Sequence, residues 1–196
     1  FTLRDGIIHY HNKPVLPQRA TKLPGVHNAE NLMAAMGIGL ALGLDFEKMS
    51  GAVQEYTAPV HRCEFIRELG RVRWINDSKA TNLDSVEKAI LSQTGPIVLI
   101  AGGKDKGFEF DAIAPLVRER VRQAVLIGEM KERIARSWSG LDCRLADSLE
   151  EAVIFASQIA RQGETVLFSP GTSSFDMFRN YGERGNRFKQ AVNALE

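Results

Sequence analysis

The spacing of hydrophobic and polar positions changes near residue 60. Before that point, apolar residues recur at helical spacing, at Leu32, Ala35, Met36, Gly39 and Leu40. This i, i+3, i+4, i+7, i+8 pattern predicts an amphipathic helix, with Asn28 as its cap and Gly43 at its end. A second helix is predicted over 46–56, and Ala58-Pro59 indicates a boundary after it.

The first residues are typical of a β-hairpin. The segment FTLRDGIIHYHNKPVLP predicts strand, turn, strand, with Arg4-Asp5-Gly6 near the turn. A hairpin by itself is marginally stable in water. We therefore expect its sheet to continue in residues upstream, and interpret the chain as a piece of a longer protein.

After residue 60, strands and helices alternate. Strands are predicted over 71–76, 96–103, 124–128 and 164–171, and helices over 84–92, 110–122, 129–138, from 148 onward and at the C-terminus. Capping boxes are predicted at Asp84/Glu87 and Ser148/Glu151. Continuous apolar strands such as PIVLIAGG are typical of a parallel sheet. The alternation therefore predicts an α/β domain with a mostly parallel sheet flanked by helices.

Polar loops follow the predicted strands. They read NDSKATN, GGKDKG, GEM and SPGTSSF. Ligands bind beyond the carboxyl ends of the strands in open α/β sheets. In NDSKATN, capping of the next helix explains Asn82 or Asp84, and leaves Asp77, Lys79 and Thr81 for a ligand.

Two further loops carry groups that suit an anion. GGKDKG fits neither a P-loop nor G-x-G-x-x-G, so Lys104 and Lys106 either pair an anion or belong to a solvated turn. SPGTSSFDMF is predicted to open a helix whose hydroxyls and N–H groups donate hydrogen bonds to a bound carboxylate. It is not a nucleophile elbow, because Phe175 replaces the last glycine.

Composition excludes several classes of function. The 25 basic and 24 acidic residues argue against a nucleic-acid partner. No apolar run reaches the roughly 20 residues of a membrane span, and the absence of a visible signal peptide favours a cytoplasmic protein. Cys63 and Cys143 are interpreted as buried thiols.

Asn28 and Asn31 suit either helix capping or an adenine edge, and Arg62 suits either an interdomain contact or a phosphate.

The order of these motifs resembles one family. HNAEN, PVHRCEF, RWINDSKATN, GGKDKG and SPGTSSFDMF followed by NYGERGNRF occur as in the Mur ligases, from about residue 24 to the C-terminus. NDSKATN and SPGTSSFDMF with ERGN are similar to the member that adds D-glutamate. That family has a UDP-binding domain, a central ATPase domain and a Rossmann-like C-terminal domain. The resemblance implies that 1–60 is the end of the central domain and 61–196 the amino-acid-binding domain.

The resemblance also implies an activity. It is an ATP- and Mg²⁺-dependent ligation of D-glutamate to UDP-N-acetylmuramoyl-L-alanine through an acyl phosphate, in peptidoglycan synthesis and hence in cell shape and division. The P-loop and the family's metal ligands are absent from this sequence, so the chain alone is expected to be inactive. The expected partners are small-molecule substrates, without nucleic acid or membrane, and the expected state is a monomer. Alternatives are a ligase for another amino acid, a folylpolyglutamate ligase, or a non-catalytic nucleotide-binding Rossmann module.

The resemblance further implies roles for single residues. Asn28 and Asn31 would contact adenine, and Arg62 and Asp77 the phosphate and ribose side of the nucleotide. Lys79, with Arg62, would lie close to the reacting phosphate. The D-glutamate carboxylates would be held by residues on several loops, namely Thr81, Lys106, Ser174, the Phe175 backbone and the nearby Tyr181. No metal ligand is expected in this part of the chain.

Overall fold

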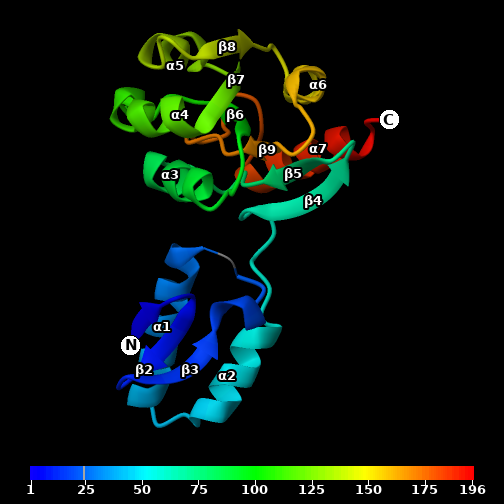
Figure 1. The fold of residues 1–196 in the computed structure, drawn as a ribbon. Helices are drawn as coiled ribbons and strands as arrows, with labels where there is room; N and C mark the ends of the chain where they lie inside the picture. The colour runs from blue at the N-terminus through cyan, green and yellow to red at the C-terminus, as the bar shows by residue number, and fades with distance from the viewer. Residues whose placement is uncertain (24) are drawn as a thin grey trace. The chain divides into compact units, whose positions relative to one another are not determined.

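The computed structural model describes residues 1–23 and 25–196, which form two compact units (Figure 1). The first unit is Phe1–Ala58 and the second is Pro59–Glu196. The division falls just before the boundary predicted near residue 60. None of the helices in the described part combines the length and apolarity that a membrane span requires.

The first unit packs a small antiparallel sheet against two helices. Its strands are β1 (Thr2–Arg4), β2 (Ile7–Tyr10) and β3 (Lys13–Pro17), in the order β1-β2-β3, and its helices are α1 (Val26–Ala41) and α2 (Phe46–Glu55), with a 3-10 turn over Gln18–Ala20. The predicted two-stranded hairpin was therefore incomplete. A second turn at His11 and Asn12, both with positive φ, folds back a third strand. Ile8 and Leu16 of this sheet are buried with Ala29, Leu32 and Met36 of α1.

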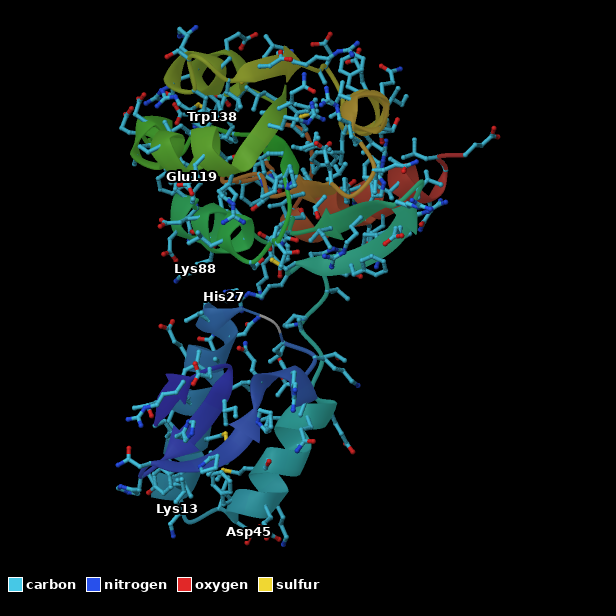
Figure 2. All side chains as sticks on the ribbon, viewed as in Figure 1. Lys13, His27, Asp45, Lys88, Glu119 and Trp138 are labelled. Atoms are coloured by element: carbon cyan, nitrogen blue, oxygen red, sulfur yellow. The ribbon has the colours of Figure 1, made fainter. Side chains whose placement is uncertain are left out.

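The start of α1 differs from the prediction, whereas its predicted end at Gly43 is confirmed. The N-cap is Gly25, so Asn28 lies inside the first turn and is not the cap. Gly43 follows the helix in a left-handed conformation (φ +76°), which glycine adopts at low cost. Ala35 of the predicted apolar stripe is exposed. The second helix begins as predicted, with Asp45 (labelled in Figure 2) accepting a hydrogen bond from the Lys48 N–H at 2.9 Å.

The second unit is built on a six-stranded sheet. Its strand order is β4-β5-β9-β6-β7-β8, and only the β4–β5 pair is antiparallel. The bounds are β4 Glu64–Leu69, β5 Val72–Asn76, β6 Ile97–Gly102, β7 Val121–Ile127, β8 Asp142–Leu145 and β9 Thr165–Phe168. The predicted mostly parallel sheet is confirmed. The edge strands β4 and β8 were not predicted, because they are partly exposed and lack a continuous apolar run.

Helices cover both faces of this sheet (Figure 1). One face carries α3 (Leu83–Leu91), α4 (Ala114–Arg120, after a 3-10 turn Phe110–Ile113) and α5 (Lys131–Ser137), and the other carries α6 (Leu149–Ile159) and α7 (Tyr181–Asn193). Side chains alternate along a strand, so Ile97 and Leu99 belong to one core and Val98 and Ile100 to the other. Figure 2 shows Lys88, Glu119 and Trp138 on the first face.

Three predicted helix starts can be compared with their caps. Asn82 caps α3 by accepting from Ser85 N–H at 2.8 Å, so the Asp84/Glu87 capping box was wrong. Ser148 caps α6 as predicted, accepting from Glu151 N–H at 3.1 Å. SPGTSSFDMF does not open a helix, because it forms a turn in which the Ser174 carbonyl accepts from Met177 and Phe178. The helix α7 begins only at Tyr181, capped by Asn180.

Candidate functional site

The loops after β5, β6 and β9 meet at the carboxyl edge of the six-stranded sheet. Their backbones are tied together: Gly171 N–H donates to Ala80 O at 3.0 Å, and Gly102 N–H to Pro170 O at 2.9 Å. Lys104 forms an isolated antiparallel bridge with Ser173, with a 3.0 Å hydrogen bond. The loop residues 77–82, 103–109 and 169–175 therefore form one connected structure, called here the carboxyl-edge loops.

The predicted D-glutamate residues are distributed over these loops. The Lys106 ammonium is exposed and donates to the Thr81 carbonyl at 3.2 Å, which brings two of the loops together. Ser174 is buried at 2% exposure, while the Phe175 side chain next to it is 66% exposed. Tyr181 begins α7, and its carbonyl accepts from the Ser78 hydroxyl at 2.8 Å. An ammonium, hydroxyls and N–H groups on converging loops suit a carboxylate ligand.

Lys79 and Arg62 present cationic side chains beside this cluster. Both are exposed, and neither forms a side-chain hydrogen bond or ion pair with another residue in the described part of the chain. The Lys79 N–H donates to the His61 carbonyl at 3.0 Å, which attaches the first loop to the segment that carries Arg62. The two cations therefore belong to neighbouring segments of one unit.

The Asp77 side chain is buried in the second unit. Its side chain accepts from Cys63 N–H at 3.1 Å and from the Ser169 hydroxyl at 2.8 Å, and the residue is only 4% exposed. Burial raises the pKa of Asp77 to about 6, although the Ser169 and Cys63 hydrogen bonds favour the charged form. The carboxylate thus links two loops to the start of the unit, and its contact with a nucleotide stays a prediction.

A polar network lies beneath the first loop. The Asn76 amide is 3.0 Å from His61 Nδ1 and donates to Gly185 O at 3.2 Å and to Glu64 at 3.3 Å. Burial lowers the pKa of His61, so the ring favours its neutral form. A Cβ at Gly185 would lie 2.3 Å from His61 Nδ1, so only glycine fits there without displacing the ring.

Several residues of the site were not identified from the sequence. Ser78, Ser169 and Arg184 are buried and connect the carboxyl-edge loops by hydrogen bonds. Their signal was present but weak: Ser78 stands inside NDSKATN, and Arg184 is the arginine of ERGN. Asn28 and Asn31 lie one turn apart on α1 of the first unit, and their adenine contact stays a prediction.

The described residues show no metal centre. No three His, Cys, Asp or Glu side chains within 1–23 and 25–196 are grouped so as to hold an ion. Cys63 and Cys143 are unpaired thiols, and burial raises both pKa values, that of Cys143 to about 11. At neutral pH both thiols are therefore protonated.

Comparison with known proteins identifies the family. The profile described as "Mur ligase, glutamate ligase domain" matches residues 61–171. The UDP-N-acetylmuramoylalanine–D-glutamate ligase of Geobacter metallireducens is 52% identical over 98% of this chain and 43% of its own length. The corresponding ligase of Geotalea daltonii is 52% identical over 90% of this chain and 39% of its own length. The chain thus spans less than half the length of these curated relatives.

Solved structures share the fold at low identity. The UDP-N-acetylmuramate–alanine ligase MurC of Thermotoga maritima has a TM-score of 0.67 at 16% identity, covering 90% of this chain and 40% of that one. The folylpolyglutamate synthase of Mycobacterium tuberculosis, complexed with ADP, has a TM-score of 0.64 at 17% identity, covering 88% and 41%. The profile match, which extends over more than half of the residues, shows that this chain belongs to the Mur ligase family.

Proposed function

We propose that this chain is the amino-acid-binding part of an ATP-dependent ligase that joins D-glutamate to UDP-N-acetylmuramoyl-L-alanine. The supporting observation is the cluster of Lys106, Thr81 and Ser174 on three loops that hydrogen bonds connect. Relatives named as D-glutamate ligases match over nearly the whole chain, which agrees with this ligand. In the proposed arrangement, 1–60 completes an ATP-binding domain and 61–196 holds the amino acid.

The carboxyl-edge loops would bind both carboxylates of D-glutamate. The Lys106 ammonium supplies a cation, and the Thr81 and Ser174 hydroxyls and the Phe175 N–H supply neutral donors. Tyr181 lies nearby as the first residue of α7. Donors fixed on different loops of one scaffold would place the amine of the ligand in one orientation, which favours its attack on an acyl group.

The cations beside this cluster suit the phosphate side of the reaction. A free carboxylate is a poor acyl donor, and phosphorylation by ATP would provide a leaving group. Lys79 and Arg62 are exposed cations that would stabilise the charge on transferring phosphate oxygens. Asp77, Asn28 and Asn31 would contact the nucleotide. Mg²⁺ would be held by residues outside this chain.

The cellular setting follows from the reaction. A ligase of this kind would act in peptidoglycan precursor synthesis in the cytoplasm, as a monomer, and would support cell shape and division. The residues 1–60 lack a P-loop sequence, so we expect the chain by itself to form no amide bond.

A substrate profile of the intact protein tests the proposal. UDP-N-acetylmuramoyl-L-alanine and ATP would be incubated with D-glutamate, L-glutamate, other amino acids or folates, and the product would be detected by mass spectrometry. We expect ATP-dependent product with D-glutamate and little with L-glutamate. Efficient ligation of a different amino acid, or of glutamate to folate, would replace the proposed activity with that of another Mur-type or folylpolyglutamate ligase.

A further inference from the structure

Arg184 is a buried cation at the point where the carboxyl-edge loops meet. It lies on α7 and is 1% exposed. Its guanidinium donates four hydrogen bonds: Nε to Ser78 Oγ at 3.1 Å, Nη2 to Ser78 O at 2.8 Å, and Nη1 and Nη2 to Thr172 O at 3.2 and 3.1 Å. The two acceptor residues belong to the loops that carry Thr81 and Ser174.

The third loop is packed onto the same guanidinium. Gly103 has a φ of +141°, and a Cβ there would lie 2.5 Å from Thr172 Oγ1, 2.6 Å from Ser173 O and 3.3 Å from Arg184 Nη1. A side chain at Gly103 would therefore clash with Thr172 and Ser173 and lie close to Arg184, so the loop that carries Lys106 packs against the same residues that Arg184 holds. Ser78 also donates to Tyr181 O, which ties the first loop to the start of α7.

The hydrogen-bond acceptors of Arg184 are all neutral groups. All four hydrogen bonds go to a hydroxyl or a backbone carbonyl, and Asp77 and Asp176 act on the charge only as more distant neighbours. Burial lowers the pKa of Arg184 to about 10. A buried charge of this kind is costly, and apolar replacement of buried charges often leaves a fold intact. Its geometry is that of a fork that joins two loops.

Resting on the proposed function, we infer that Arg184 is a positioning residue for D-glutamate: its forked hydrogen bonds to Ser78 and Thr172 set the spacing between the loops that hold the two carboxylates. Lysine has no planar fork and places its donors at one point, so it cannot hold both acceptors in the same geometry. A small displacement of a binding group lowers productive binding strongly. Of the proposed nucleotide contacts, Asn28 and Asn31 lie on α1, outside these loops, and the Asp77 side chain is held by Cys63 and Ser169, not by Arg184.

Steady-state kinetics of the intact protein test the inference with Arg184→Lys and Arg184→Met. We expect the KM for D-glutamate to rise about 10-fold or more in both variants, while the KM for ATP stays within about twofold. The matched control is Arg187→Met, on the same helix, where the side chain is exposed and pairs with Glu150. That variant is expected to keep both KM values, and melting temperatures are measured for all proteins.

The outcomes separate a positioning role from a structural one. Folded Arg184 variants with an unchanged D-glutamate KM, or with equal changes in both KM values, would overturn the inference. If neither variant folds, Ser78→Ala decides: it removes one acceptor, and an unchanged D-glutamate KM would again overturn the inference. Failure of the unmodified protein to ligate D-glutamate contradicts the proposed function instead, and the same KM comparison is then made with the amino acid that it does ligate.

Discussion

Buried charged side chains at the two ends of the six-stranded sheet differ in their partners and in the direction of their pKa shifts. At the amino edge, Arg122 forms a two-point ion pair with Glu164, at 2.5 and 2.8 Å. The hydrogen bonds to Glu164 raise the pKa of Arg122. Burial alone would raise the pKa of Glu164, but the hydrogen bonds from Arg122 hold the pKa of Glu164 below its usual range. At the carboxyl edge, burial shifts the pKa values of Asp77 and Arg184 toward their neutral forms.

Cations at both edges also donate to backbone carbonyls. At the amino edge, Arg118 donates to Ser139 O at 3.1 Å and Arg120 to Gln93 O at 2.6 Å. At the carboxyl edge, Lys106 donates to Thr81 O at 3.2 Å, and Arg133 pairs with Asp105 and Glu109. The difference between the two edges therefore lies in the buried charges: Arg122 and Glu164 pair with each other, whereas the hydrogen-bond partners of Asp77 and Arg184 are neutral groups. Strongly perturbed titratable groups are typical of functional sites.

The largest expected effect concerns the pH dependence of stability through Asp77. Its folded pKa of about 6 exceeds the ordinary value of 3.8, so its contribution to stability is fully present below pH 3.8 and is lost as pH rises through about 6. The lost free energy is about 3 kcal/mol. Urea denaturation from pH 4 to 7 should show this decline as the difference in stability between the unmodified chain and Asp77→Asn, because other groups with shifted pKa values, such as Glu164, contribute equally to both. An identical pH profile for the variant would show that Asp77 titrates normally.

A loss of binding at the carboxyl edge is expected for Lys106. In the intact protein, Lys106→Ala should raise the D-glutamate KM roughly 30-fold, because a charge-assisted hydrogen bond contributes about 2 kcal/mol. The matched control is Arg118→Ala, at the other end of the sheet, which should leave that KM unchanged. Equal KM values for the Lys106 variant and the unmodified protein would remove Lys106 from the site.

A loss of stability without loss of binding is expected at the amino edge. Arg122→Met leaves the buried Glu164 carboxylate without its ion-pair partner and should lower the free energy of unfolding by about 2 kcal/mol. Chemical denaturation measures the loss, and D-glutamate kinetics under stabilising conditions should be unaffected. A raised D-glutamate KM in a fully folded variant would contradict the separation between the two edges.

A smaller effect tests the cap that ends the first carboxyl-edge loop. Asn82→Ala should destabilise α3 by about 1 kcal/mol, since its side chain accepts from Ser85 N–H. Asp84→Ala removes only an exposed pair with Lys88 and should cost less, about 0.5 kcal/mol. Thermal unfolding of both variants measures the difference, and the reverse order would restore the capping box that the sequence suggested.

The sequence predicted the architecture better than the interior of the site. Apolar runs such as PIVLIAGG identified the buried strands, and parallel strands bring their carboxyl ends together, so the gathering of Thr81, Lys106 and Ser174 on neighbouring loops followed from the order of elements. The edge strands β4 and β8 carry no such run. Arg184 was missed because only the tertiary position of α7 places its guanidinium between two loops distant in sequence.

The most direct test of the central claim is a titration of D-glutamate into the chain, followed by backbone amide chemical shifts. We expect changes concentrated in residues 77–82, 103–109 and 169–175, saturating with D-glutamate at lower concentration than with L-glutamate. The amides around Arg122 and Glu164 at the amino edge should not move. Saturating D-glutamate that shifts none of the carboxyl-edge loops, or that shifts the amino edge instead, would contradict the account.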